Sequence, residues 1–189
     1  MRTVLRYGIL LTLLMVCFCS HTLKRPVWTF EKSAVRIHIK ADNRLNTYNN
    51  KAHTLYVCLY QLQDVIAFDK YSSDASGIRQ MLECRLFDGS MVSANSKVIH
   101  PGEDIVLTLD RAERAQYVGI VAGYSAELTG ERVVRRHKFQ VQKKKEGYFQ
   151  KVVKCEPCEV NLEVALGPSQ IEYSQLISRP KVTCIDECE

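Results

Sequence analysis

The chain has 189 residues, of which 46% are hydrophobic and 25% are charged, as in a soluble globular protein with one sizeable core. The formal net charge is +5. This excess is too small to favour a nucleic acid as the partner, and the export signal described next argues against nucleic acid further.

The first nineteen residues are unlike the rest of the chain. Arg2 and Arg6 precede an almost uninterrupted apolar run from Tyr7 to Phe18. That run is shorter than the roughly 20 residues of a membrane-spanning helix. Because it also opens the chain, residues 1–19 are predicted to be a secretory signal. No second apolar segment of this length follows, so the mature protein is expected not to span a membrane.

The end of the signal resembles a bacterial lipobox, in which the cysteine after the cleavage point receives acyl chains. Leu14-Met15-Val16-Cys17 fits that pattern except at Val16, where a small residue is usual. Cys19 competes, although bulky Phe18 precedes it. Acylation at Cys19 would leave six cysteines, an even number that can pair fully, whereas acylation at Cys17 would leave seven. The residue before the cleavage point favours Cys17, because Phe18 is bulkier than Val16. We expect Cys17 to be the lipid anchor; acylation of Cys19 and release without acylation are the alternatives.

Residues 20–33 contain Pro26 and no clean periodicity, and are expected to form a tether. From Val35 to Ile39, apolar and polar residues alternate as in a half-buried strand. The next segment, Asp42 to Lys51, is rich in asparagine, which tolerates left-handed backbone conformations. It is longer than a hairpin needs, so it is either a solvated turn or a binding surface.

The segment from Thr54 to Leu62 is the centre of the predicted fold. It is dense in β-branched, aromatic and aliphatic residues, which predicts a strand buried on both faces. Leu55, Val57 and Leu59 would face one way, and the residues between them the other. Such a strand needs a covering layer on each side.

The remaining elements are shorter. A polar turn is predicted from Asp69 to Gly77, and apolar residues at helical spacing predict one helix from Ile78 to Leu86 that ends by Gly89. Strands are predicted at Met91–Val98, Ile105–Leu109, Tyr117–Tyr124, Arg132–Val141, Val160–Leu166 and Ile171–Tyr173, with a turn at 128–131 and a basic insertion at 143–154 in a loop.

About eight short strands with evenly spaced turns and one helix indicate an all-β fold. We expect a two-sheet antiparallel β-sandwich with one short added helix. The chain then divides into a signal peptide at 1–19, a tether at 20–33, the sandwich domain at 34–174 and a cysteine-containing tail at 175–189.

Several short motifs follow one another between Ala34 and Tyr173. Each is unspecific alone, but their order and spacing behind a lipobox-like signal are more specific. They are the loop around Asn46, Tyr60-Gln61-Leu62-x-Asp64 with Phe68, the helix ending near Leu86, Pro101-Gly102-Glu103, Tyr117-Val118-Gly119-Ile120-Val121-Ala122-x-Tyr124, and the strand pair from Leu162 to Ile171.

In this order the sequence resembles the outer-membrane lipoproteins of type VI secretion, the TssJ family. The family usually has a Trp-Arg pair where Glu131-Arg132 stands here, and the basic insertion and cysteine-rich tail have no counterpart that we can place. The resemblance implies a transthyretin-like β-sandwich, held by acyl chains at the periplasmic face of the outer membrane. It also implies that the domain binds the periplasmic part of a TssM-like inner-membrane protein.

The resemblance further implies where that partner binds, since the family's loop between the first two strands contacts TssM. The corresponding residues are polar and include types that are frequent in interfaces. They are Asn43, Arg44, Leu45, Asn46, Thr47, Tyr48, Asn49, Asn50 and Lys51.

Four cysteines near the C-terminus form two close pairs, Cys155-x-x-Cys158 and Cys184-x-x-x-Cys188. In an oxidising compartment they are expected to form two disulfides, in one of three connectivities. Structural zinc is the second interpretation, and a redox pair the third. Cys58 and Cys84 are expected to be buried thiols, with a bond between them as the alternative.

We find no catalytic constellation, and we expect neither an enzyme nor a cofactor. Two hypotheses remain. The first is a scaffold lipoprotein that recruits a protein partner in the periplasm. The second is an exported ligand- or zinc-binding domain that uses the C-terminal cysteines.

Overall fold

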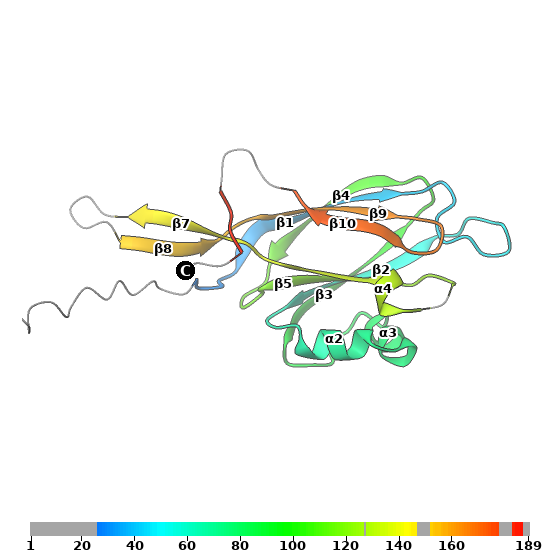
Figure 1. Ribbon diagram of the computed structural model, residues 1–189, viewed down its shortest axis with the longest axis horizontal. Coiled ribbons are helices and arrows are strands. Elements are labelled where there is room, and N and C mark those ends of the chain that lie inside the picture. Colours follow the sequence, from blue (N-terminus) through cyan, green and yellow to red (C-terminus); the bar gives the residue numbers. More distant parts are fainter. Residues whose placement is uncertain (1–25, 127, 147–151, 178–182, 187–189) are drawn as a thin grey trace, which may run out of the picture.

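The computed structural model describes residues 26–126, 128–146, 152–177 and 183–186, which form two stacked β-sheets with a hairpin at one end (Figure 1). The strands are β1 (Glu31–Ala41), β2 (Leu55–Leu62), β3 (Met91–Ile99), β4 (Asp104–Arg111), β5 (Tyr117–Ala122), β6 (Val134–Lys138), β7 (Val141–Glu146), β8 (Val152–Pro157), β9 (Val160–Leu166) and β10 (Ile171–Leu176). The helices are α2 (Ile66–Ser72), α3 (Ala75–Met81) and α4 (Gly130–Val133).

The strands pair in three groups. One sheet has the order β10-β9-β1-β4, the other has the order β3-β2-β5-β6, and β7 pairs with β8 alone. This confirms the predicted all-β sandwich. One pairing departs from the expected antiparallel pattern, because β1 runs parallel to β9. That contact joins segments far apart in the sequence, which local patterns do not report.

The strand β2 is buried on both faces, as predicted, with Tyr56 as the exposed exception. On the outer face, the Tyr60 hydroxyl donates to the Met81 carbonyl at 2.5 Å, and its ring meets Phe68 edge-on at a centroid distance of 6.1 Å. Toward the other sheet, the Gln61 amide donates to the Asp110 carbonyl and accepts from the Ala112 N–H, both at 2.8 Å. The Tyr-Gln-Leu motif is therefore structural: it joins the helices to one sheet and that sheet to β4.

Close packing of α2 on the sheet depends on a glycine. A Cβ atom at Gly119 of β5 would approach the Phe68 ring to 2.6 Å, well inside ordinary contact distance. Phe68 itself is fully buried. The Asp64 carboxylate accepts from the Ile66 N–H at 3.0 Å at the start of α2. The sequence Asp64-x-x-x-Phe68 thus starts the helix and fixes its buried face.

The helical region differs from the prediction. Two helices, α2 and α3, cover the outer face of the β3-β2-β5-β6 sheet where one helix was expected (Figure 1). Ile78 and Met81 are buried as predicted, but α3 ends at Met81, and Leu86 is 56% exposed. Cys84 has a positive φ of 55°, which is incompatible with a continuing helix.

Two other boundaries also differ. The predicted strand from Arg132 to Val141 is divided into β6 and the start of β7, and the short helix α4 stands in the predicted turn. The predicted basic loop at 143–154 is a hairpin, because β7 and β8 pair from Val141–Pro157 to Glu146–Val152. At the other end of the chain, β1 begins at Glu31, inside the predicted tether.

Candidate functional site

The loop between β1 and β2 has a fixed base built around Asn46. This side chain is buried; its Nδ2 donates to the Thr54 carbonyl at 2.9 Å, and its Oδ1 accepts from the Ser125 N–H at 2.8 Å. Asn46 therefore ties the loop to the start of β2 and to the segment after β5. Leu45 beside it is fully buried, and the Thr47 N–H donates to the Pro168 carbonyl at 2.7 Å.

The tip of the loop is a small hairpin. Tyr48 and Lys51 exchange both backbone hydrogen bonds, at 2.9 and 3.0 Å. Between them, Asn49 and Asn50 have positive φ angles of 49° and 59°, the signs that a type I′ turn requires. Asparagine tolerates this conformation better than most residues. Asn49 and Asn50, from the asparagine-rich run noted in the sequence, therefore form a tight turn at the tip. Asn46, at the base of the loop, also has a positive φ, of 47°.

The loop presents polar and aromatic side chains to solvent. Tyr48 at the tip is 55% exposed, and Arg44 before the base is 78% exposed, with its Nε 3.8 Å from the Asp42 carboxylate. The ring of His53 lies 6.4 Å from that of Tyr48, and its Nε2 lies 3.3 Å from the Tyr48 carbonyl oxygen. Of the nine residues named from the sequence, Leu45 and Asn46 belong to the buried base. The others are exposed or half-buried, so any contact with a partner falls to them.

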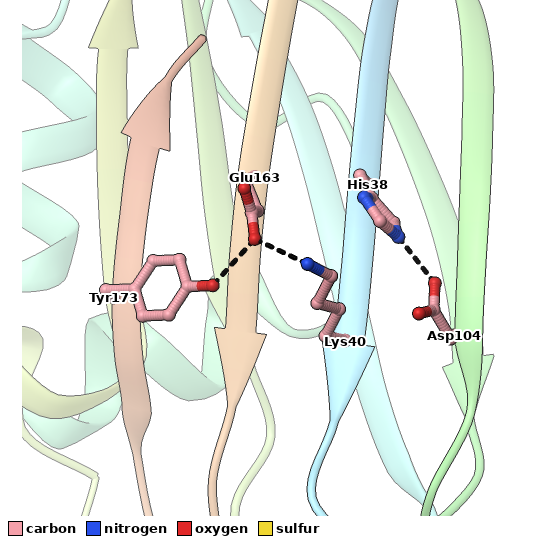
Figure 2. A network of polar contacts seen from close by, with 5 residues as sticks. All are labelled: His38, Lys40, Asp104, Glu163 and Tyr173. Carbon is pink, nitrogen blue, oxygen red and sulfur yellow. Dashed lines mark hydrogen bonds and ion pairs between the residues drawn. The ribbon is translucent and has the colours of Figure 1, made fainter.

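The outer face of the β10-β9-β1-β4 sheet is also polar, but its charged groups are paired with one another (Figure 2). Glu163 accepts from both Lys40 and Tyr173 at 2.8 Å, and His38 contacts Asp104 at 2.5 Å. The Lys40 and Tyr173 hydrogen bonds lower the pKa of the Glu163 carboxyl. The charged side chains drawn on this face therefore satisfy one another, as Arg44 and Asp42 do on the loop.

Arg111, at the end of β4, is a structural residue that the sequence interpretation missed. Its side chain is only 2% exposed, and its Nη2 lies 2.8 Å from the Glu31 carboxylate. Its Nε and Nη2 both donate to the Thr29 carbonyl, each at 3.3 Å. Burial lowers the pKa of this guanidinium, while Glu31 raises it. The signal was present in the sequence, since Arg111 falls on the inward phase of the Ile105-Leu107-Leu109 alternation.

The C-terminal cysteines lie at the base of the β7–β8 hairpin. Cys158 and Cys184 form a disulfide, and Cys155 is also disulfide-bonded. Cys188 lies outside the described residues. The segment around Cys184 is attached further, because Ile185 and Val141 exchange backbone hydrogen bonds at 2.8 Å. The tail is thus joined to the hairpin.

Cys58 and Cys84 also form a disulfide, which corrects the expectation of two buried thiols. The positive φ at Cys84 turns the chain at the end of α3 so that its Cα lies 5.6 Å from that of Cys58 on β2. Sequence spacing does not report this turn. The bridge fastens the helical layer to the sheet.

The zinc alternative loses three of its four ligands, because Cys155, Cys158 and Cys184 are disulfide-bonded and their sulfurs are therefore not thiolates. Within the described parts of the chain, no group of three or more His, Cys, Asp or Glu residues is arranged to hold a metal ion. None of the helices in those parts is both long and apolar enough to cross a bilayer. The proposed anchors Cys17 and Cys19 lie outside the described residues.

Comparison with known proteins identifies the fold and the family. The family model described as type VI secretion lipoprotein (VasD, EvfM, TssJ) matches residues 33–169. The chain is similar in structure to the type VI lipoprotein TssJ1 from Pseudomonas aeruginosa, with a TM-score of 0.56 and 20% identity, over 82% of this chain and 100% of that one. No curated protein matches the sequence.

Two further structures are similar at lower identity. One is Serratia marcescens Lip, a membrane-bound component of the type VI secretion system, with a TM-score of 0.53 and 15% identity over 77% of this chain and 97% of Lip. The other is a chain in the structure of the TssM C-terminal domain from EAEC, with a TM-score of 0.53 and 14% identity over 77% of this chain and 98% of that one. At these identities the matches show a shared fold.

Proposed function

The chain belongs to the TssJ family of type VI secretion lipoproteins, and we propose that it is anchored by acyl chains at the periplasmic face of the outer membrane. There it binds the periplasmic part of a TssM-like inner-membrane protein through the loop from Asn43 to Lys51. The family is a structural component of the secretion system and is not known as an enzyme family.

The observation that carries this proposal is the construction of the loop. Its base is fixed by Asn46, while its tip exposes Tyr48 on a tight turn. A surface that is already ordered loses little conformational entropy when a partner binds. Tyrosine and arginine are also frequent at the energetic centres of interfaces, and asparagine supplies adaptable hydrogen bonds.

The position of the loop supports the same proposal. Residues 42–54 lie at one end of the sandwich, and the first described residues lie at the other end, beside the β7–β8 hairpin (Figure 1). An anchor that precedes residue 26 therefore joins the domain at the end opposite the loop. In this arrangement the loop faces away from the outer membrane, toward a partner that reaches across the periplasm.

The test is a binding titration with the periplasmic part of the TssM-like protein. Tyr48→Ala changes an exposed residue of the tip and Arg44→Ala an exposed residue just before the base, and both leave the buried Leu45 and Asn46 side chains in place. Truncating a central interface tyrosine typically costs 1–2 kcal/mol or more, so affinity should fall by about tenfold. Tyr173→Ala, on the outer face of the sheet, is the matched control and should bind as the wild type does. If Tyr48→Ala and Arg44→Ala both retain full affinity, the interface lies elsewhere.

Anchoring is tested separately. We propose acylation at Cys17, so Cys17→Ser should leave the domain soluble and abolish type VI secretion. Two acyl signals or more are needed for stable membrane attachment, and a lipoprotein anchor supplies several chains. Mass spectrometry of the wild-type protein should show an acylated N-terminal cysteine. An unmodified N-terminus at Ser20 would rule out the lipid anchor.

A further inference from the structure

We propose that the β7–β8 hairpin, together with the start of the described chain, forms a second membrane contact that binds anionic lipid headgroups. The inference rests on the proposed function in one respect: it takes the acyl anchor to precede residue 26, at the hairpin end of the domain. It assigns a role to the basic insertion, which has no counterpart that we could place in the family.

The hairpin and the start of the chain are neighbours. A cavity of about 510 Å³ lies between them, and its lining includes Val27, Phe30 and Lys154. The start of the chain is held in this position because the Trp28 carbonyl accepts from the Arg114 N–H at 2.7 Å, in addition to the contacts of Arg111. The direction from which an anchored tether enters is therefore fixed relative to the hairpin.

The hairpin carries an excess of positive charge. Its two strands contain four lysines and two glutamates in the sequences VQKKKE and VVKCEP. Lys143, Lys144 and Lys154 are exposed. Lys144 and Lys154 are also cross-strand neighbours, although Lys144 contacts Glu156 at 3.2 Å. The excess of lysines over glutamates gives the hairpin a net positive charge, which an anionic surface attracts.

Apolar side chains accompany these lysines. Val27 is 72% exposed and Phe30 is 60% exposed, and both line the cavity shared with the hairpin. Exposed apolar residues beside a basic cluster fit a bilayer interface, where the apolar groups enter the boundary of the acyl chains and the lysines meet anionic headgroups. An acidic protein partner would match the lysines but would leave Val27 and Phe30 unexplained.

The geometry allows the hairpin to reach the bilayer. Val27 is ten positions after Cys17, which limits their distance to about 35 Å even for a fully extended chain. Each strand of the hairpin has six residues, a length of about 20 Å. In Figure 1 the hairpin extends beyond the sandwich at the end where the described chain begins. An anchored domain therefore holds the hairpin close to the headgroups.

The experiment uses the protein from residue 20 onward, without the signal and without acyl groups, so that the anchor does not mask the contact. Its sedimentation is measured with phosphatidylcholine vesicles and with vesicles that also contain phosphatidylglycerol. We expect binding to the anionic vesicles alone, weakened by salt. Each lysine near a charged surface contributes about 1 kcal/mol, or roughly fivefold in affinity. Lys143→Gln with Lys144→Gln should therefore weaken binding by about 30-fold.

The matched control removes two positive charges at the opposite end of the domain, by Arg44→Gln with Lys51→Gln, and should leave vesicle binding nearly unchanged. Equal losses in the two double variants, or no binding to anionic vesicles, would overturn the inference. The inference would also be overturned if the Lys143 and Lys144 double variant kept vesicle binding but lost binding to the partner protein. The hairpin would then be a protein interface. If wild-type protein binds vesicles but not the TssM-like partner, the proposed function fails while this inference stands.

Discussion

The stability of the loop between β1 and β2 should depend on the Asn46 side chain. Asn46→Ala removes the hydrogen bonds to the Thr54 carbonyl and the Ser125 N–H. Each lost bond costs about 1 kcal/mol. Alanine at a φ of 47° adds strain, which costs roughly 1 kcal/mol more. We therefore expect the free energy of unfolding to fall by about 3 kcal/mol.

Two variants separate these contributions. Asn46→Gly loses the same hydrogen bonds but tolerates the positive φ, so it should cost about 2 kcal/mol. Asn43→Ala changes an exposed asparagine of the same loop and should be nearly neutral.

Urea unfolding followed by circular dichroism measures the effect. With a slope near 2 kcal/mol/M, the Asn46→Ala midpoint should shift by about 1.5 M and the Asn46→Gly midpoint by about 1 M. An unchanged midpoint for Asn46→Ala would show that the side chain does not hold the loop. Equal shifts for the alanine and glycine variants would refute the part of the argument that concerns φ.

Three further predictions concern the disulfides and pH. Replacing both Cys158 and Cys184 by serine opens a bridge that spans 26 residues, so stability should fall by about 3–4 kcal/mol and proteolysis of the tail should begin. Replacing Cys58 and Cys84, also 26 apart, should cost a similar amount and release the helical layer, seen as faster hydrogen exchange in α3. Burial and nearby Arg135 lower the pKa of His137, so the folded protein favours the neutral ring. Stability should therefore be constant above about pH 6.5 and decrease as the pH falls below it, a dependence that His137→Gln should weaken in thermal melts.

The sequence predicted the features that depend on local pattern. β2 was recognised because apolar residues fill both of its faces, and the loop after β1 was recognised because asparagine favours positive φ angles. Three of these asparagines do have positive φ: Asn46, Asn49 and Asn50. The buried position of Asn46 was not predictable in this way. Its side chain is held by hydrogen bonds to Thr54 and Ser125, and only the fold brings these two residues beside it.

The errors arose where distant segments decide the structure. Leu86 continued the helical spacing, but the chain turns at Cys84 to meet Cys58, so the helix cannot extend that far. The lysine-rich run was interpreted as a loop because of its charge. Pairing between Lys143 and Cys155 and along both strands makes it a hairpin.

The parallel pairing of β1 with β9 has a consequence for how the domain assembles. Lys40 on β1 and Glu163 on β9 are 123 residues apart in sequence, yet their side chains are hydrogen-bonded across the two paired strands. Pairings of such long range are slow to form, because a long loop must close before any contact is gained. In the proposed export, the chain emerges with its N-terminus first, so β1 would wait with one edge unpaired until β9 arrives. The strand nearest the proposed anchor is thus completed late, and its exposed edge stays open to other binding partners until the domain closes.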